Sequence, residues 1–386
     1  MRTLAVFLLA VLLPFVQSCN EDTPAGPPRP GDEGPDFSAF DDAVEASLDA
    51  LGLTGAAAVI VHRDLGIVHT RGYGAFAADH VFLIASAGKP ISAGVLMRLD
   101  DQGLLDIDAP IGTYVAGRWG EEKAAITVAQ LLSNSSGLVG LIDGPLYEPY
   151  RCQYSPDGTL TSCAHEIYGA DDADDVIPPD TWFRYGGAQW QFAGGIAEVV
   201  SGKSWAELIR ETYVEPCGTK SLGYTNQFSS GGAVRYPSWF QGDTANLPST
   251  LNPNIEGGAY ITVEDYGKIL LLHLRSGLCG NTRVLSEGAV RRMREDRIGA
   301  VYGGETGVPG LEGYGLGWWI DRSADGVAAS PGLYGAIPWI DERRGYGAFI
   351  AIEGGAVERH RLWSETRPIL EEIFDELDQE ALRRQR

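Results

Sequence analysis

The tetrad Ser86-Ala87-Gly88-Lys89 places a hydroxyl and an amine at a spacing that suits nucleophilic chemistry. A serine hydroxyl is a weak nucleophile until a base takes its proton, and residues three apart on a helix share a face. The tetrad follows an apolar run over 81–85 and opens an amphipathic pattern over 90–101. We therefore expect a strand-to-helix turn on which Lys89 reaches the Ser86 oxygen. The positive helix N-terminus should favour the developing alkoxide and a neutral lysine.

A Ser-x-x-Lys tetrad alone is weak evidence, because a surface lysine on an ordinary helix gives the same pattern. Four further segments raise its weight, and they follow in this order: Leu131–Leu138, Phe183–Gly187 with Gly194–Ile196, Glu256–Tyr260 and Tyr314–Trp318. Together with Phe82–Lys89 they resemble the ordered motifs of the serine β-lactamase and penicillin-binding-protein superfamily, in particular its class C-like and esterase-like members. The resemblance extends from about Phe40 to Phe374.

The resemblance implies a role for each matched residue. Ser86 becomes the acyl-accepting nucleophile, Lys89 its partner, and Tyr185 a general base or acid. The backbone N–H groups of Ser86 and Leu333 become the donors of an oxyanion hole. A half-buried core tyrosine remains the alternative interpretation of Tyr185.

Two departures from the superfamily pattern bear on specificity. The Tyr-x-Asn motif is here Tyr185-Gly186-Gly187, so the phenol is present and the amide is missing. The third motif, which borders the oxyanion hole, corresponds to Ser330-Pro331-Gly332, without the lysine that often anchors a substrate carboxylate. We expect Ser330 and Gly332 to lie beside the substrate. The pattern favours an esterase-like hydrolase of small ester or amide substrates, and leaves β-lactamase or D-alanyl-D-alanine carboxypeptidase activity as the alternative.

Two rival interpretations belong to other classes. An α/β-hydrolase also carries its serine on a strand-to-helix turn, but the Gly-x-Ser-x-Gly elbow is only half matched at 84–88. A non-catalytic, surface-tethered binding lipoprotein would explain the altered second and third motifs. Retention of Ser86, Lys89 and Tyr185 together counts against it.

The first residues are typical of an export signal. An apolar run over 4–16 ends in Val16-Gln17-Ser18-Cys19, which resembles a lipobox, so residues 1–19 are predicted to be a signal peptide with Cys19 as the lipidated residue. An ordinary signal peptide with an incidental cysteine is the alternative. Residues 20–36 are rich in Pro, Gly and acidic residues, as in a solvated tether.

The chain has five cysteines, an odd number that lipidation of Cys19 would make even. Cys152 and Cys163 would then close a short local loop, which leaves Cys217 to pair with Cys279.

Charge and composition exclude several partners. A net charge of −22 and a pI near 4.6 argue against binding to nucleic acid, and contact with a membrane is expected only through the N-terminal lipid anchor. The six histidines form no metal-binding motif, so no metal or other cofactor is predicted. Because the first residues predict export, we expect the protein in the periplasm or at the cell surface.

The distribution of patterns predicts an α+β fold in one domain over residues 37–386. Helical spacing at 37–51 and 362–384 and β-rich runs near both ends indicate an antiparallel sheet covered by terminal helices, with a mostly helical region inserted between. Strands are expected at 56–62, 67–71, 315–321, 327–330, 336–341 and 347–352. Residues 147–180, with an acidic run, are predicted to be a surface insertion.

Overall fold

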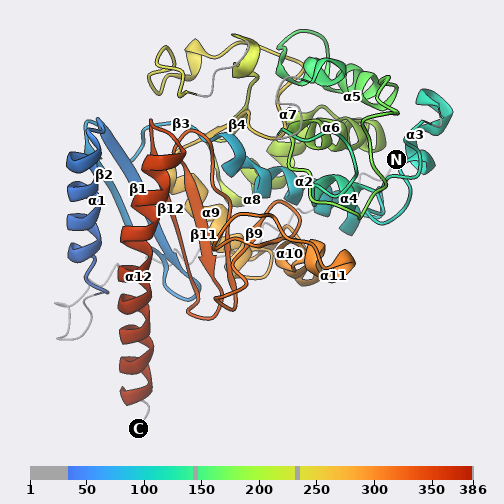
Figure 1. Cartoon of the computed structure of the whole chain (residues 1–386). Coiled ribbons are helices and arrows are strands. Elements are labelled where there is room, and N and C mark those ends of the chain that lie inside the picture. The colour runs from blue at the N-terminus through green and yellow to red at the C-terminus, as the bar shows by residue number, and fades with distance from the viewer. Residues whose placement is uncertain (1–33, 121, 142–146, 231–234, 385–386) are drawn as a thin grey trace, which may run out of the picture. The chain divides into compact units, whose positions relative to one another are not determined.

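The computed structural model describes residues 34–120, 122–141, 147–230 and 235–384, so the signal peptide, Cys19 and most of the tether lie outside the described residues. Within these ranges a seven-stranded antiparallel sheet has the order β2-β1-β12-β11-β10-β9-β8 (Figure 1). Strands from the two ends of the chain, β1 and β12, are therefore neighbours in the sheet. Their bounds are β1 Gly55–His62, β2 Gly66–Gly74, β8 Gly313–Tyr314, β9 Trp319–Ile320, β10 Val327–Ala329, β11 Ile337–Asp341 and β12 Tyr346–Ile352.

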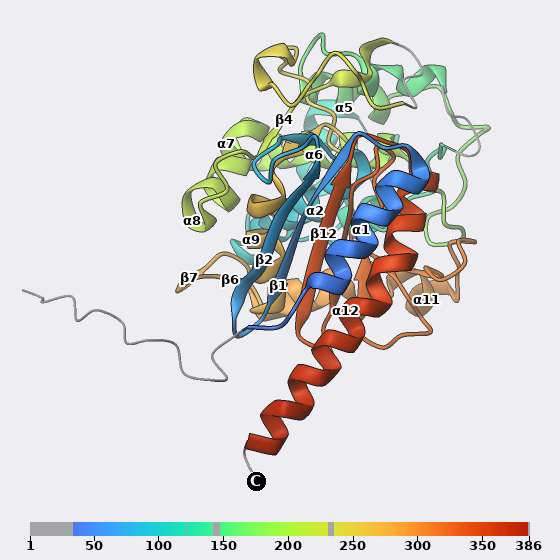
Figure 2. The same cartoon turned by 90° about the vertical axis from the view of Figure 1, so that its left-hand side faces the viewer.

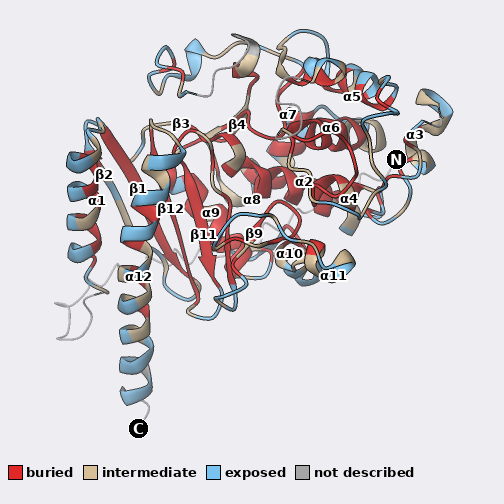
Figure 3. Cartoon of the chain, in the orientation of Figure 1, coloured by how far each residue is buried: buried red, intermediate tan, exposed pale blue. Residues whose placement is uncertain are grey.

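Helices cover both faces of this sheet, which is why β1 is buried along its whole length and is apolar from Gly55 to Val61. Ala56, Ala58 and Ile60 face α1 (Ser38–Leu51) and α12 (Ala356–Arg384), which lie on one face of the sheet in Figure 2. The alternate residues Ala57 and Val59 belong to the core on the other face, where α9 (Val263–Leu274) packs. Strands β1 and β12 are accordingly buried throughout (Figure 3). The predicted α+β class is confirmed.

Most of the helical region lies in the sequence between the strands of a short second sheet, β3-β5-β4 (Phe82–Leu83, Ala259–Ile261 and Gly223–Tyr224). Its larger helices pack around α2 and α6 in one apolar core with the inner face of the main sheet. An antiparallel sheet closed by terminal helices is not the parallel, doubly wound order of an α/β-hydrolase, so that rival is excluded. The remaining helices are α2 Lys89–Asp101, α3 Gly112–Trp119, α4 Val128–Leu132, α5 Leu160–Tyr168, α6 Gly187–Ser201, α7 Trp205–Ile209, α8 Glu215–Cys217, α10 Glu287–Arg294 and α11 Arg297–Tyr302.

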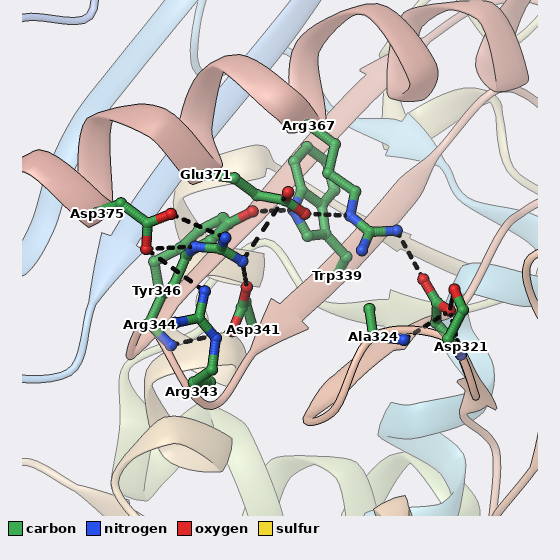
Figure 4. A network of polar contacts seen from close by, with 11 residues as sticks. Asp321, Ala324, Trp339, Asp341, Arg343, Arg344, Tyr346, Arg367, Glu371 and Asp375 are labelled. Atoms are coloured by element: carbon green, nitrogen blue, oxygen red, sulfur yellow. Dashed lines mark hydrogen bonds and ion pairs between the residues drawn. The ribbon is translucent and has the colours of Figure 1, made fainter.

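A polar network fixes α12 to the main sheet (Figure 4). Arg344, in the turn between β11 and β12, contacts Asp341 at 2.7 Å and Asp375 of α12 at 2.9 Å. Also on α12, Arg367 lies 2.9 Å from the buried Asp321. These half-buried pairs share partners and are less exposed to screening than isolated surface pairs. They hold the middle of α12 in place against the strand ends.

Two predictions about local structure are wrong. Of the expected strand over 315–321 only β9 is present, because residues 315–318 form the turn that connects β8 to β9, in which Gly317 has φ +88°. Residues 147–180 are not a surface insertion: they form the 3₁₀ segment η2 (Glu148–Tyr154) and α5, and Leu160, Ile167 and Tyr168 are fully buried. α5 packs against α6, so this segment is part of the helical core.

Both predicted disulfides, Cys152–Cys163 and Cys217–Cys279, are present. The first ties η2 to α5, and the second ties α8 to the hairpin strand β6 (Leu278–Cys279), which pairs with β7 (Thr282–Arg283).

Replacing Cys217 and Cys279 together by serine should lower the free energy of unfolding by about 2–4 kcal/mol, because the crosslink restrains a long stretch of the unfolded chain. The sequence separation is 62 residues for this pair and 11 for Cys152–Cys163. Urea titration of both double variants checks the prediction, with the shorter loop as the matched comparison. Equal or larger destabilisation from the shorter loop would contradict the entropic origin of the effect.

Candidate active site

Ser86 lies in a tight turn between β3 and α2. The 3₁₀ segment η1 (Ala85–Gly88) leads directly into α2, and Ala85 has the unusual φ of +47°. A 3₁₀ turn aligns residues three apart, so the side chains at 86 and 89 face each other. Lys89 Nζ lies 3.0 Å from Ser86 Oγ, as the tetrad predicts.

Lys89 is completely buried, and its ammonium group is surrounded by polar and aromatic partners. Besides Ser86, it donates to Glu256 Oε2 at 3.1 Å and to the Glu256 carbonyl at 3.3 Å. The rings of Tyr185 and Trp190 lie 4.6 and 5.7 Å from Nζ. Burial alone would lower the pKa of Lys89, but the charges and hydrogen bonds of Tyr185 and Glu256 outweigh it, and the pKa is raised.

The expectation of a neutral lysine is therefore wrong for the resting site. A protonated Lys89 donates to Ser86 and cannot take its proton. Nucleophilic chemistry at Ser86 requires either that Tyr185 accepts the proton or that Lys89 first loses one of its own.

Tyr185 is positioned by the segment 131–138 that the sequence singled out. Asn134, at φ +54°, accepts a hydrogen bond from Gly186 N–H at 3.2 Å through its side chain and one from Arg184 N–H at 2.8 Å through its carbonyl. Gln189 of α6 connects the same two segments, because its side-chain amide donates to the Asn134 side chain at 3.2 Å and to the Arg184 carbonyl at 2.6 Å. These bonds hold the segment 131–138 against the segment 183–187 and so fix the position of Tyr185.

Gly187, where the superfamily motif has an amide, has no room for a side chain. A Cβ atom at this position would lie 2.1 Å from Glu256 Oε1 and 2.3 Å from Gln153 Oε1. The carboxylate of Glu256 thus occupies the space beside Lys89 that a side chain at 187 would fill. The sequence analysis did not assign a role to Glu256, and only the coincidence of a glycine at 187 with a carboxylate at 256 could have indicated one.

Glu256 reaches the site through the pairing of β3 with β5. Leu83 is paired with Tyr260, and Ile84 N–H donates to the Ala259 carbonyl at 3.0 Å. This register places the turn before β5 alongside the turn that carries Ser86.

The third motif lies against the nucleophile segment, as its register predicts. The Ser330 hydroxyl donates to the Ser86 carbonyl at 3.1 Å, and a Cβ on Gly332 would lie 2.2 Å from the Ile84 carbonyl. Ser330 and Gly332 therefore hold the third motif against the segment that carries Ser86. Neither residue is among those that line the cleft. Leu333 does line it. Within the described part of the chain, the N–H groups of Ser86 and Leu333 have no hydrogen-bond acceptor, so both are available to a substrate oxygen.

Ser86, Tyr185 and Glu256 open onto a cleft of about 1130 Å³. Residues of η2 and α5, the segment that was predicted to be a surface insertion, also line this cleft. Both apolar and charged side chains line this cleft, among them Leu141, Tyr154, Phe228, Val308, Leu311, Trp319, Glu148, Arg151, Glu166 and Arg359.

Arg359, in the first turn of α12, is a cation that the sequence analysis missed. Its Nη1 donates to the Gly332 carbonyl at 2.7 Å, and its buried Nε has no partner among the described residues. Burial lowers the pKa of its guanidinium, and no carboxylate of the described residues is among the groups that act on it. Arg184, beside the Tyr185 motif, instead donates to the carbonyls of Gly137 and Asp175 and does not line the cleft.

A search of the described residues finds no group of three or more His, Cys, Asp or Glu side chains arranged to hold a metal ion. None of the helices described is both long and apolar enough to span a bilayer.

The family model described as Beta-lactamase matches residues 40–365, and the chain belongs to this family of serine hydrolases. Penicillin-binding protein 4 of Amycolatopsis lactamdurans is 28% identical over 288 residues, which are 68% of this chain and 70% of that protein. The crystal structure of a putative β-lactamase from Bacteroides dorei DSM 17855 is 28% identical, covers 84% of this chain and 92% of its own, and has a TM-score of 0.66. The esterase/β-lactamase LipL of Mycobacterium tuberculosis is 28% identical over 159 residues, 39% of this chain and 33% of LipL.

Proposed function

We propose that the protein is a serine hydrolase that cleaves small esters through an acyl-enzyme on Ser86. The observation that carries the proposal is the 3.0 Å contact between Ser86 Oγ and the buried Lys89 Nζ, at the base of a cleft that Tyr185 also lines. Family membership and the similarity to a relative named as an esterase support it.

The reaction follows from the positions of these groups. Ser86 Oγ attacks the carbonyl carbon as its proton passes to the Lys89–Tyr185 pair, and the carbonyl oxygen becomes an oxyanion between the N–H groups of Ser86 and Leu333. Collapse of this intermediate expels the alcohol, which takes a proton from Tyr185 or Lys89. A water molecule then attacks the acyl-serine, and the acid leaves with Ser86 restored.

The substrate class depends on the charges around the cleft. Ser330 presents no cation to it, which favours neutral esters, whereas Arg359 offers a guanidinium without a carboxylate partner among the residues that the structure describes. This second observation favours an alternative in which the cleft takes substrates with a carboxylate, such as penicillins or D-alanyl peptides. A binding protein without turnover is the remaining alternative, and it would keep the cleft while Ser86 stays unreactive.

We further propose that the protein is exported and held at a membrane by a lipid on Cys19, which would place the substrate outside the cytoplasm. The two disulfides support export, since such bonds persist in oxidising compartments.

The purified protein without its first 19 residues should hydrolyse short-chain p-nitrophenyl esters, and Ser86→Ala should lower kcat by three orders of magnitude or more, because no other group can form the acyl-enzyme. A fluorophosphonate probe followed by mass spectrometry should label Ser86 in the wild type alone. Thermal melting of the variant controls for folding. Full activity of Ser86→Ala would place the nucleophile elsewhere, and absence of labelling would favour the binding protein.

Arg359→Gln should change the preference between a neutral p-nitrophenyl ester and its analogue with a terminal carboxylate. A charge-assisted contact contributes roughly 1.5–3 kcal/mol, so the ratio of kcat/KM for the charged substrate to that for the neutral one should fall about 10- to 100-fold. Arg184→Gln is the matched control, since its guanidinium points at backbone carbonyls. An unchanged ratio in Arg359→Gln would remove Arg359 from substrate recognition.

A further inference from the structure

We propose that Glu256 is the proton acceptor for Lys89, which lets a buried, protonated lysine act as the base for Ser86. The inference rests on the proposed function, because it concerns how Ser86 is activated. It makes Glu256 a positioning residue that acts through Lys89, in the space left by the missing amide of the Tyr-x-Asn motif.

The Glu256 carboxylate lies in the space that a side chain at position 187 would occupy. A Cβ at position 187 would lie 2.1 Å from Glu256 Oε1 and 2.4 Å from its carboxyl carbon. A side chain at 187 and the observed carboxylate cannot coexist. The loss of the amide and the presence of Glu256 are therefore one structural change at Lys89.

The Gln153 side chain offers a hydrogen-bond acceptor to a protonated Glu256. Gln153 Oε1 is buried and has no hydrogen-bond donor among the described residues, and its amide is oriented by a 3.1 Å bond from Nε2 to the Tyr150 carbonyl. Glu256 Oε1 and Gln153 Oε1 both lie within 2.3 Å of the point where a Cβ of residue 187 would be. An ionised Glu256 faces this oxygen with a second acceptor, whereas a protonated Glu256 can donate to it.

The loop that carries Glu256 is held firmly enough to keep this geometry. Asn254 donates from its side chain to the Gln153 carbonyl at 2.9 Å and accepts from Gly257 N–H at 2.8 Å. Ile255 N–H donates to the Gln191 side chain of α6 at 3.1 Å. The residues on either side of Glu256 are thus bonded to both η2 and α6.

The proton balance is closed within the site. Lys89 gives one ammonium proton to Glu256 Oε2, which leaves a neutral amine and a carboxylic acid. The amine lone pair takes the Ser86 hydroxyl proton as Oγ forms its bond to the substrate carbonyl carbon, so Lys89 is an ammonium again and one proton is stored on Glu256. When the intermediate collapses, the leaving alkoxide takes a proton from Lys89 or Tyr185, and Glu256 returns its proton to the group that gave it.

Titratable groups from several elements face the Glu256–Lys89 pair. They are Tyr185 from the loop before α6, Tyr154 from η2, Tyr314 from β8 and, next to Tyr185, Arg359 of α12. Burial raises the pKa of Tyr154 and Tyr314, which favours their neutral phenols. The Glu256 carboxylate, in direct contact with Lys89 Nζ, is therefore the acceptor that the proposal uses.

Glu256→Gln keeps the size of the side chain and removes its basicity. We expect kcat for a p-nitrophenyl ester to fall roughly 100-fold with KM changed by less than about threefold. Glu256→Asp should keep part of the activity. Glu264→Gln is the matched control, because Glu264 also faces a lysine, at 3.6 Å, but on the exposed surface of α9.

Gly187→Ala tests the position of the carboxylate without removing it, and it should lower kcat tenfold or more because the new Cβ displaces Glu256 Oε1. The rate at which a fluorophosphonate labels Ser86 provides a readout that needs no turnover, and it should follow the same order among the variants. Melting temperatures identify any variant that fails to fold, in which case Glu256→Asp and Gly187→Ala carry the test.

A Glu256→Gln protein with the wild-type kcat and labelling rate would overturn the inference while the wild type remains a serine hydrolase. A wild type that is neither labelled nor active on esters would instead overturn the proposed function. The two failures are therefore distinguished by the wild-type measurement alone.

Discussion

Burial of the Lys89 ammonium is the constraint on which the rest of the site depends. Removing a cation from water is costly unless an anion and hydrogen-bond acceptors replace its hydration. The partners come from different parts of the chain: Ser86 from η1, Glu256 from the turn before β5, and the rings of Tyr185 and Trp190 from the loop and helix at α6. Each must be in place at once, so the fold around the lysine has little freedom.

The sequence predicts the features that depend on local spacing. The Ser86–Lys89 contact follows from residues one 3₁₀ turn apart, and the β1–β2 hairpin and the helix at 38–51 follow from periodicity and turn residues. The pairing of Cys217 with Cys279 follows from elimination once Cys19 is set aside, although Cys19 itself lies outside the described residues. The third motif is found through its register alone, and the structure places Ser330 against Ser86.

The features that the sequence does not predict depend on contacts between distant segments. Residues 147–180 look like a loop because their apolar face is short, yet that face is buried against α6. The strand expected at 315–321 is broken at Gly317, where the turn passes so close to α2 that a Cβ would lie 3.0 Å from the Lys89 carbonyl. The roles of Glu256 and Arg359 depend on contacts with distant residues. The Glu256 carboxylate fills the space beside Gly187, and Arg359 donates to the Gly332 carbonyl. No pattern within either segment indicates these relationships.

The pairing of β1 with β12 has a consequence for biosynthesis. Ala56 is aligned with Ile352 and His62 with Tyr346, so the sheet joins residues that are made near the beginning and near the end of synthesis. Contacts of such long sequence separation form late, after the intervening chain is available. A nascent chain that has not yet reached β12 already contains Ser86, Lys89 and Tyr185, but β1 and β11 still lack the strand that joins them in the sheet. The connection between β10 and β11, which carries Leu333, can therefore reach its final place beside Ser86 only when nearly the whole chain has been made.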